Sequence, residues 1–103
     1  MKKTVLLALA MYCGSAAAQG TIGGTLHGAT LREWHQATFG NQLATVADIV
    51  AKVLNLNDPL SVARKARDVQ SCINRVSENF SLRSQMVADT AVACMAELGY
   101  LPR

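Results

Sequence analysis

Downstream of residue 30, apolar positions recur with the period of an α-helix in three successive stretches. The members of each stripe follow one another at spacings of three and four: Phe39, Leu43, Val46, Val50 and Val53; then Val62, Ala66, Val69, Ile73 and Val76; then Val87, Ala91, Cys94 and Leu98. Such spacing places apolar side chains on one face of a helix. Alternating strand patterns bounded by Asn-Gly or Asp-Gly turns are absent. The pattern predicts an all-α fold, a small bundle of about three helices.

Polar residues at the ends of the first stripe predict where its helix begins and bends. Thr30 is followed three residues later by Glu33, which is the pattern of a capping box. Gly40 and Asn41 interrupt the stripe, and we expect a bend or break there because glycine disfavours a helix interior. The first helix is expected to end near residues 54–56.

The next two helices have start signals of their own. Asp58, followed by a proline, is a favourable N-cap for the second helix, which is expected to end near residues 77–79. Ser81 and Ser84 are both competent caps for the third helix. The last two helices should therefore form an antiparallel hairpin with its turn near residues 81–84.

The first 18 residues, MKKTVLLALAMYCGSAAA, have the pattern of a cleaved signal peptide. Two lysines precede a short apolar stretch, and Ala16 to Ala18 supply the small residues before the cleavage site. The apolar stretch is about half the ~20 residues that a spanning helix needs. Cys13 follows Tyr12 rather than a small residue, so it fits a lipid-attachment site poorly. We expect export to the periplasm or secretion, with no integral membrane segment after cleavage.

Removal of residues 1–18 changes the charge and the organisation of the chain. The formal charge falls from +3 to +1, which gives no argument for nucleic acid as a partner. Residues 19–29, QGTIGGTLHGA, hold four glycines without an apolar period and are expected to form a flexible arm. Residues 30–103 are then a single helical domain.

Cys72 and Cys94 are the two cysteines that remain after the expected cleavage. Their midpoint falls in the expected turn, so they lie level with each other across the hairpin. An oxidising compartment then favours a structural disulfide between them. A metal site and a redox pair are the alternatives, but the redox Cys-x-x-Cys spacing is absent and zinc needs four ligands. His27 and His35 are the only histidines, so we expect no metal and no cofactor.

The stretch from Trp34 to Phe39 offers the candidate binding residues. Trp34, His35 and Phe39 lie near the start of the first helix and could together contact a protein partner. The structural alternative is that Trp34 packs over one end of the hairpin, because large apolar side chains are scarce in this chain.

Motifs that carry catalysis are missing, including G-x-S-x-G, H-E-x-x-H and a phosphate-binding glycine loop. We therefore expect a non-enzymatic protein that binds another protein, as an inhibitor or immunity-type protein would. In size and cysteine count the chain resembles two kinds of bacterial periplasmic protein, small immunity proteins and acid-activated chaperones. No motif residue carries over from either. An acid- or stress-activated chaperone is the alternative function, and the partner and the oligomeric state stay open.

Overall fold

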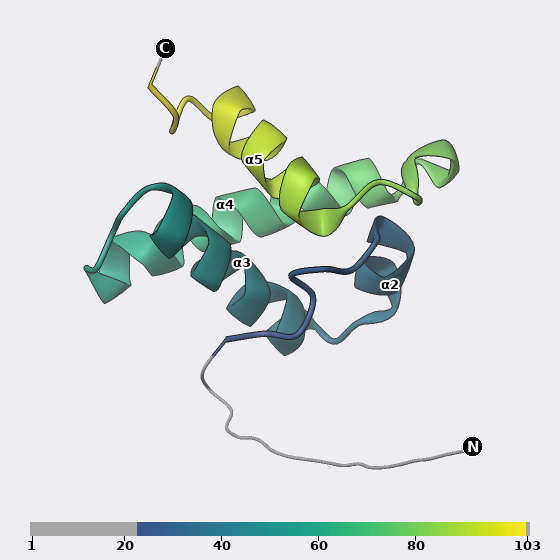
Figure 1. The fold of residues 1–103 in the computed structure, drawn as a ribbon, viewed down its shortest axis with the longest axis horizontal. Coiled ribbons are helices and arrows are strands. Elements are labelled where there is room, and N and C mark those ends of the chain that lie inside the picture. Colours follow the sequence, from purple (N-terminus) through teal and green to yellow (C-terminus); the bar gives the residue numbers. More distant parts are fainter. Residues whose placement is uncertain (1–22, 103) are drawn as a thin grey trace.

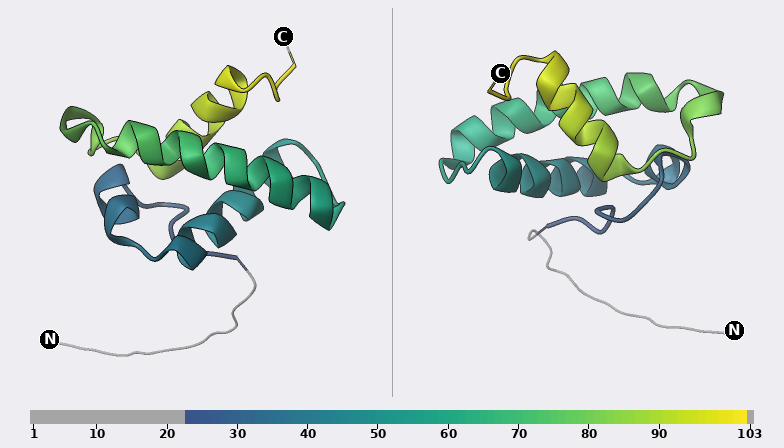
Figure 2. Two further views of the ribbon diagram at one scale, coloured as in Figure 1. Left: turned by 180° about the vertical axis from the view of Figure 1, so that it is seen from behind. Right: turned by 45° about the horizontal axis from the view of Figure 1, so that its top comes forward.

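The computed structural model describes residues 23–102, and these fold into helices packed around a central one. The elements in chain order are α2 (Leu31–Gln36), α3 (Phe39–Val53), α4 (Pro59–Ser77), the 3-10 turn η3 (Phe80–Leu82) and α5 (Val87–Glu97). Helix α4 contacts each of the others, with α3 along one side and α5 crossing above it (Figures 1 and 2). The predicted all-α class is confirmed. The expected signal peptide and Cys13 lie outside the described residues.

The expected first helix is divided in two, and the break lies before the predicted position. The capping box at Thr30 and Glu33 starts α2, as predicted. Ala37 then adopts an extended conformation, and the Thr38 hydroxyl accepts from the amide of Asn41 to start α3. Gly40 thus lies inside the first turn of α3. A second side-chain cap, rather than the glycine, determines where the chain bends.

The buried face of α3 differs from the apolar stripe read from the sequence. Val46 and Val50 are fully buried, but Phe39 and Val53 at the ends of the stripe are exposed. Two polar side chains, Gln42 and Thr45, are buried instead. Burial is tolerated because both are hydrogen-bonded: Gln42 Nε2 donates to the carbonyl of Trp34 at 2.7 Å, and Thr45 Oγ1 donates to the carbonyl of Asn41 at 2.8 Å.

Helix α4 follows the sequence prediction closely. Asp58 caps it by accepting hydrogen bonds from the hydroxyl and amide of Ser61, and these bonds lower the pKa of the Asp58 carboxyl. The centre of the predicted stripe forms the core, with Ala66, Val69 and Ile73 fully buried. The helix ends at Ser77, at the near edge of the predicted range.

The third helix begins later than either predicted serine. Residues 80–82 form η3, and α5 begins at Val87 without a side-chain cap. The connection is held in place because Leu31 and Arg32 donate backbone hydrogen bonds to the carbonyls of Gln85 and Arg83. The amide of Val87 in turn donates to the carbonyl of Ala29. The start of α5 is therefore determined by pairing with a segment more than fifty residues away along the chain.

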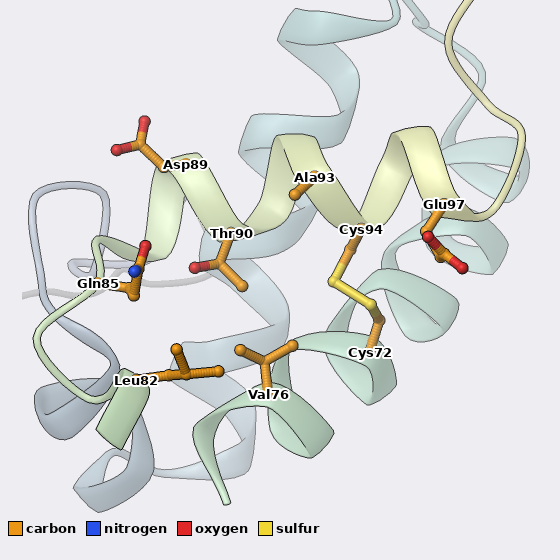
Figure 3. A pocket seen from close by; sticks show the side chains of 9 residues that line it. All are labelled: Cys72, Val76, Leu82, Gln85, Asp89, Thr90, Ala93, Cys94 and Glu97. Carbon is orange, nitrogen blue, oxygen red and sulfur yellow. A yellow bond between two sulfur atoms is a disulfide. The ribbon is translucent and has the colours of Figure 1, made fainter. Parts of the chain in front are cut away.

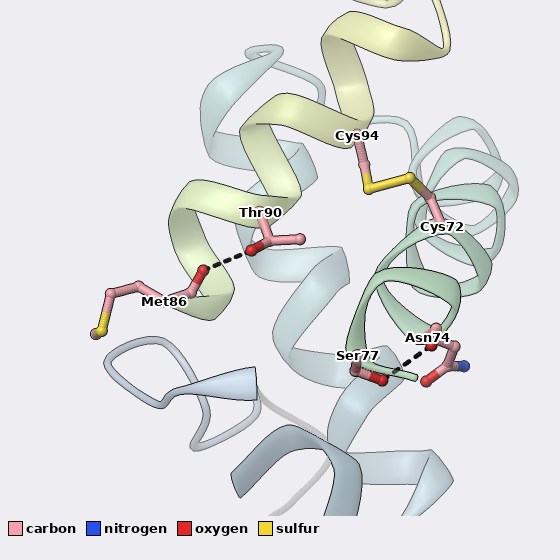
Figure 4. The surroundings of a disulfide bond; sticks show 6 residues. All are labelled: Cys72, Asn74, Ser77, Met86, Thr90 and Cys94. Carbon is pink, nitrogen blue, oxygen red and sulfur yellow. Dashed lines mark hydrogen bonds between the residues drawn. A yellow bond between two sulfur atoms is a disulfide. The ribbon is translucent and has the colours of Figure 1, made fainter. Parts of the chain in front are cut away.

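A disulfide joins α4 to α5, as the spacing of the cysteines predicted (Figure 4). Cys72 and Cys94 lie with their Cα atoms 6.0 Å apart, and both are buried. The same view shows that two nearby hydroxyls bond within their own helices. Thr90 donates to the carbonyl of Met86, and Ser77 donates to that of Asn74. The disulfide thus lies in an apolar contact between the two helices.

Residues 23–29 pack along α3, which differs from the flexible arm expected there. Leu26 is buried, and its amide donates to Thr45 Oγ1. His27 Nε2 donates to Asp48 Oδ2 at 3.0 Å. Gly24 lies so close to α3 that an added Cβ would stand 2.6 Å from the carbonyl oxygen of Asn41. The glycine therefore permits a close approach of two backbones rather than flexibility.

The chain after α5 turns back toward α4. Gly99 has a φ of +80°, a left-handed conformation that glycine adopts without strain. The amide of Tyr100 donates to the carbonyl of Met95, and the Tyr100 hydroxyl donates to Asp68 Oδ2 at 2.7 Å. Lys65 Nζ lies 4.3 Å from the centre of the Tyr100 ring. Within residues 23–102, no helix is both long enough and apolar enough to cross a membrane.

The contact between Tyr100 and Asp68 predicts a loss of stability at alkaline pH. The hydrogen bond to the carboxylate raises the pKa of Tyr100 to about 12, against about 10 in an unfolded chain. Its contribution is complete below pH 10 and is lost as the pH rises through 12, because only the protonated phenol can donate. Urea unfolding should show the stability difference between wild type and Tyr100→Phe shrinking over that interval. A constant difference would contradict the assignment.

Candidate partner-binding surface

Trp34 does not belong to the surface. Its side chain is 0% exposed, and the indole Nε1 donates to Asn74 Oδ1 at 2.8 Å. The carbonyl of the same residue accepts from buried Gln42. Of the three residues predicted to contact a partner, Trp34 therefore follows the structural alternative and packs between α2 and α4, where it offers no area to a second protein.

His35, the next residue, lies on the surface beside the α4–α5 connection. Arg83 Nη2 donates to His35 Nε2 at 3.3 Å. The same guanidinium donates through Nε to the carbonyl of Ser77, and its central carbon lies 5.3 Å from the centre of the Phe80 ring. Arg83 is thus held between a histidine and a phenylalanine that is itself 74% exposed.

Phe39 is 64% exposed at the start of α3. It borders a recess of about 180 Å³, whose other walls are Arg67, Gln70, Ser71 and Asn74 of α4. The recess is fixed from below, because Gln70 Nε2 donates both to the carbonyl of Phe39 and to the side chain of Gln42. The first turn of α3 and the middle of α4 therefore form one rigid unit under the ring.

Partly buried hydrogen bonds in the C-terminal half of α4 link the two groups. Asn74, which borders the Phe39 recess, accepts from the Ser77 hydroxyl, and the carbonyl of Ser77 accepts from Arg83. We call this region the aromatic–arginine surface; it comprises His35, Phe39, Arg67, Phe80 and Arg83. The structure brings two of the sequence-predicted residues, His35 and Phe39, to it. Phe80 was missed because one phenylalanine in a polar segment has no periodic signal.

Acidic and basic side chains of the described residues differ in how many contacts they make within the fold. Four carboxylates serve internal contacts: Glu33 and Asp58 cap helices, Asp48 meets His27, and Asp68 accepts from Tyr100. Between residues 23 and 102, by contrast, no lysine or arginine lies within 4.0 Å of a carboxylate oxygen. The cations of the aromatic–arginine surface are therefore available to carboxylates from outside.

Models of known protein families, curated proteins and solved structures were compared with this chain, and none matches. In the described part of the chain, no three histidine, cysteine, aspartate or glutamate side chains are grouped so that they could hold a metal ion.

Proposed function

We propose that this protein acts by binding another protein through the aromatic–arginine surface, as an inhibitor or immunity-type protein does, in the periplasm or outside the cell. The exposure of both phenylalanines is the observation that carries the proposal. Four aromatic residues lie between positions 23 and 102. Trp34 and Tyr100 pack against the fold, whereas Phe39 and Phe80 leave most of their rings uncovered.

Covering those rings is a source of binding free energy. Aromatic side chains are enriched among the few interface residues that dominate affinity, and arginine is enriched with them. Both rings lie next to an arginine, Arg67 beside Phe39 and Arg83 beside Phe80. Hydrogen bonds from Gln70 and Arg83 fix the backbone beneath both rings. Binding a partner should therefore cost little conformational entropy at this surface.

The charge pattern specifies the chemistry of the partner. Arg67 and Arg83 have no carboxylate partner among the described residues, while several carboxylates are engaged within the fold. A partner that presents carboxylates around an apolar patch would complement this surface. The disulfide supports the location, because such bonds persist in oxidising compartments outside the cytoplasm.

The test begins with the native mass of tagged protein recovered from its own host at neutral pH. We expect a stoichiometric complex with one acidic partner. With that partner purified, Phe39→Ala and Phe80→Ala should each weaken the affinity by about tenfold or more, the range of interface residues that dominate binding. Arg67→Glu should slow association and weaken its dependence on salt.

Leu60→Ala is the matched control. Leu60 is an exposed apolar residue at the beginning of α4, whereas Phe80 follows the opposite end of that helix. Its truncation should leave the affinity unchanged. This result would distinguish binding at the aromatic–arginine surface from nonspecific hydrophobic binding. Equal losses for Leu60→Ala and Phe39→Ala would reject the surface. A complex that forms only at acid pH would instead favour the chaperone alternative.

A further inference from the structure

One contact within the aromatic–arginine surface depends on the protonation state of a histidine. Arg83 Nη2 lies 3.3 Å from His35 Nε2, and this contact joins α2 to the connection between α4 and α5. A guanidinium stays protonated and can only donate hydrogen bonds, so the imidazole nitrogen must be the acceptor. His35 is therefore neutral in this contact, with its single proton on Nδ1. Protonation of Nε2 removes the acceptor and places a second positive charge beside the guanidinium.

The other contacts of the connection do not depend on His35. Arg83 also donates through Nε to the carbonyl of buried Ser77. Leu82, the residue before Arg83, points toward Val76 of α4 across a groove that both residues line (Figure 3). Loss of the His35 contact should therefore free one end of the guanidinium, while the backbone and Nε stay in place.

Within residues 23–102, no carboxylate is placed to neutralise a protonated His35. The charged residues on α2 and on the segments beside its C-terminal half are Arg32, Glu33, Arg75, Glu78 and Arg83. The Glu33 carboxylate accepts from the amide of Thr30. No carboxylate oxygen of the described residues lies within 4.0 Å of the His35 ring. Protonated His35 and Arg83 would thus be adjacent cations without an anion of the fold between them.

The second histidine responds to protonation in the opposite way. His27 Nε2 lies 3.0 Å from Asp48 Oδ2, and a carboxylate can only accept a hydrogen bond. Protonation of His27 therefore strengthens its contact, because the hydrogen bond becomes charge-assisted. One fall in pH thus tightens the contact of His27 and breaks that of His35, which makes His27 an internal control.

We propose that His35 is a pH-dependent switch in the aromatic–arginine surface. Neutral His35 holds the guanidinium of Arg83, whereas protonated His35 and Arg83 form a pair of cations that one carboxylate from outside can bridge. This inference rests on the proposed function, since the carboxylate would come from the acidic partner. The affinity of the surface for a carboxylate should rise as the pH falls through the range in which histidines gain a proton.

The state of His35 can be measured on the full chain without a partner. At about pH 8, the ring nitrogen chemical shifts of isotope-labelled protein should show a proton on Nδ1 and none on Nε2. At about pH 5, both nitrogens should carry protons. A neutral His35 with its proton on Nε2 would overturn the switch, and this result would leave the proposed function standing.

Formate is the probe for the carboxylate. Amide chemical shifts would be followed while formate replaces chloride at constant ionic strength, at the same two pH values. We expect changes around His35 and Arg83, with formate bound about threefold to fivefold more tightly at the lower pH, because an exposed ion pair contributes up to about that factor. Equal formate affinity at both pH values would overturn the proposal.

Two matched variants assign the effect to one histidine. In His35→Gln, the amide oxygen can accept from Arg83 at either pH, so formate affinity should no longer depend on pH. His27→Gln makes the same exchange at the other histidine and should keep the pH dependence of the wild type. Loss of the dependence in His27→Gln, with its retention in His35→Gln, would reject the assignment to His35.

Discussion

Replacement of Trp34 by alanine should destabilise the protein by about 4 kcal/mol, the usual cost of removing a large buried aromatic side chain. The indole is fully buried between α2 and α4, and its N–H donates to Asn74. Because the whole stability of a small domain is about 5–15 kcal/mol, the variant loses a large share of it. Far-ultraviolet circular dichroism during urea unfolding measures the effect.

A graded variant keeps the result interpretable if Trp34→Ala does not fold. Trp34→Phe retains most of the apolar volume but removes the donor to Asn74, so its destabilisation should be smaller. Phe39→Ala, at an exposed position, should change the stability by no more than about 0.5 kcal/mol. Similar stability for Trp34→Ala and Phe39→Ala would show that the indole is not part of the core. The comparison also separates the two aromatic residues that the sequence grouped together as partner contacts.

Removal of the disulfide should lower the unfolding free energy by about 3 kcal/mol, the loop-closure value for a bridge between residues this far apart. Cys72 and Cys94 are separated by 22 positions. The double variant Cys72→Ala/Cys94→Ala is preferred over serine, because both sites are buried and a serine hydroxyl there would need a hydrogen-bond partner. The midpoint and slope of urea unfolding give the difference.

Reduction provides the internal control for that measurement. Wild-type protein treated with a thiol reductant should unfold at a urea concentration close to that of the double variant, and the reductant should not change the variant. Unchanged wild-type stability after complete reduction would contradict a stabilising role for the bridge.

Features that depend on neighbouring residues or on helical period could be predicted from the amino-acid order alone. The stripe of Ala66, Val69 and Ile73 identified the buried face of α4, and Thr30 and Asp58 identified two helix starts through their own side chains. The disulfide followed from the same logic, because the position of the turn between two helices determines which residues lie level across it.

Features whose partners are distant in the chain could not be predicted in this way, because they depend on how the helices pack. The start of α5 depends on backbone hydrogen bonds with residues 29–32, and residues 23–29 pack on α3 because Gly24 allows close approach and Leu26 is buried. The burial of Trp34 and the exposure of Phe39 also depend on tertiary packing. One lies under α4 and the other beside it, although both were read from the sequence as candidates for the same patch. Helical period reports which side of a helix is apolar, but burial depends on which other segment covers that side.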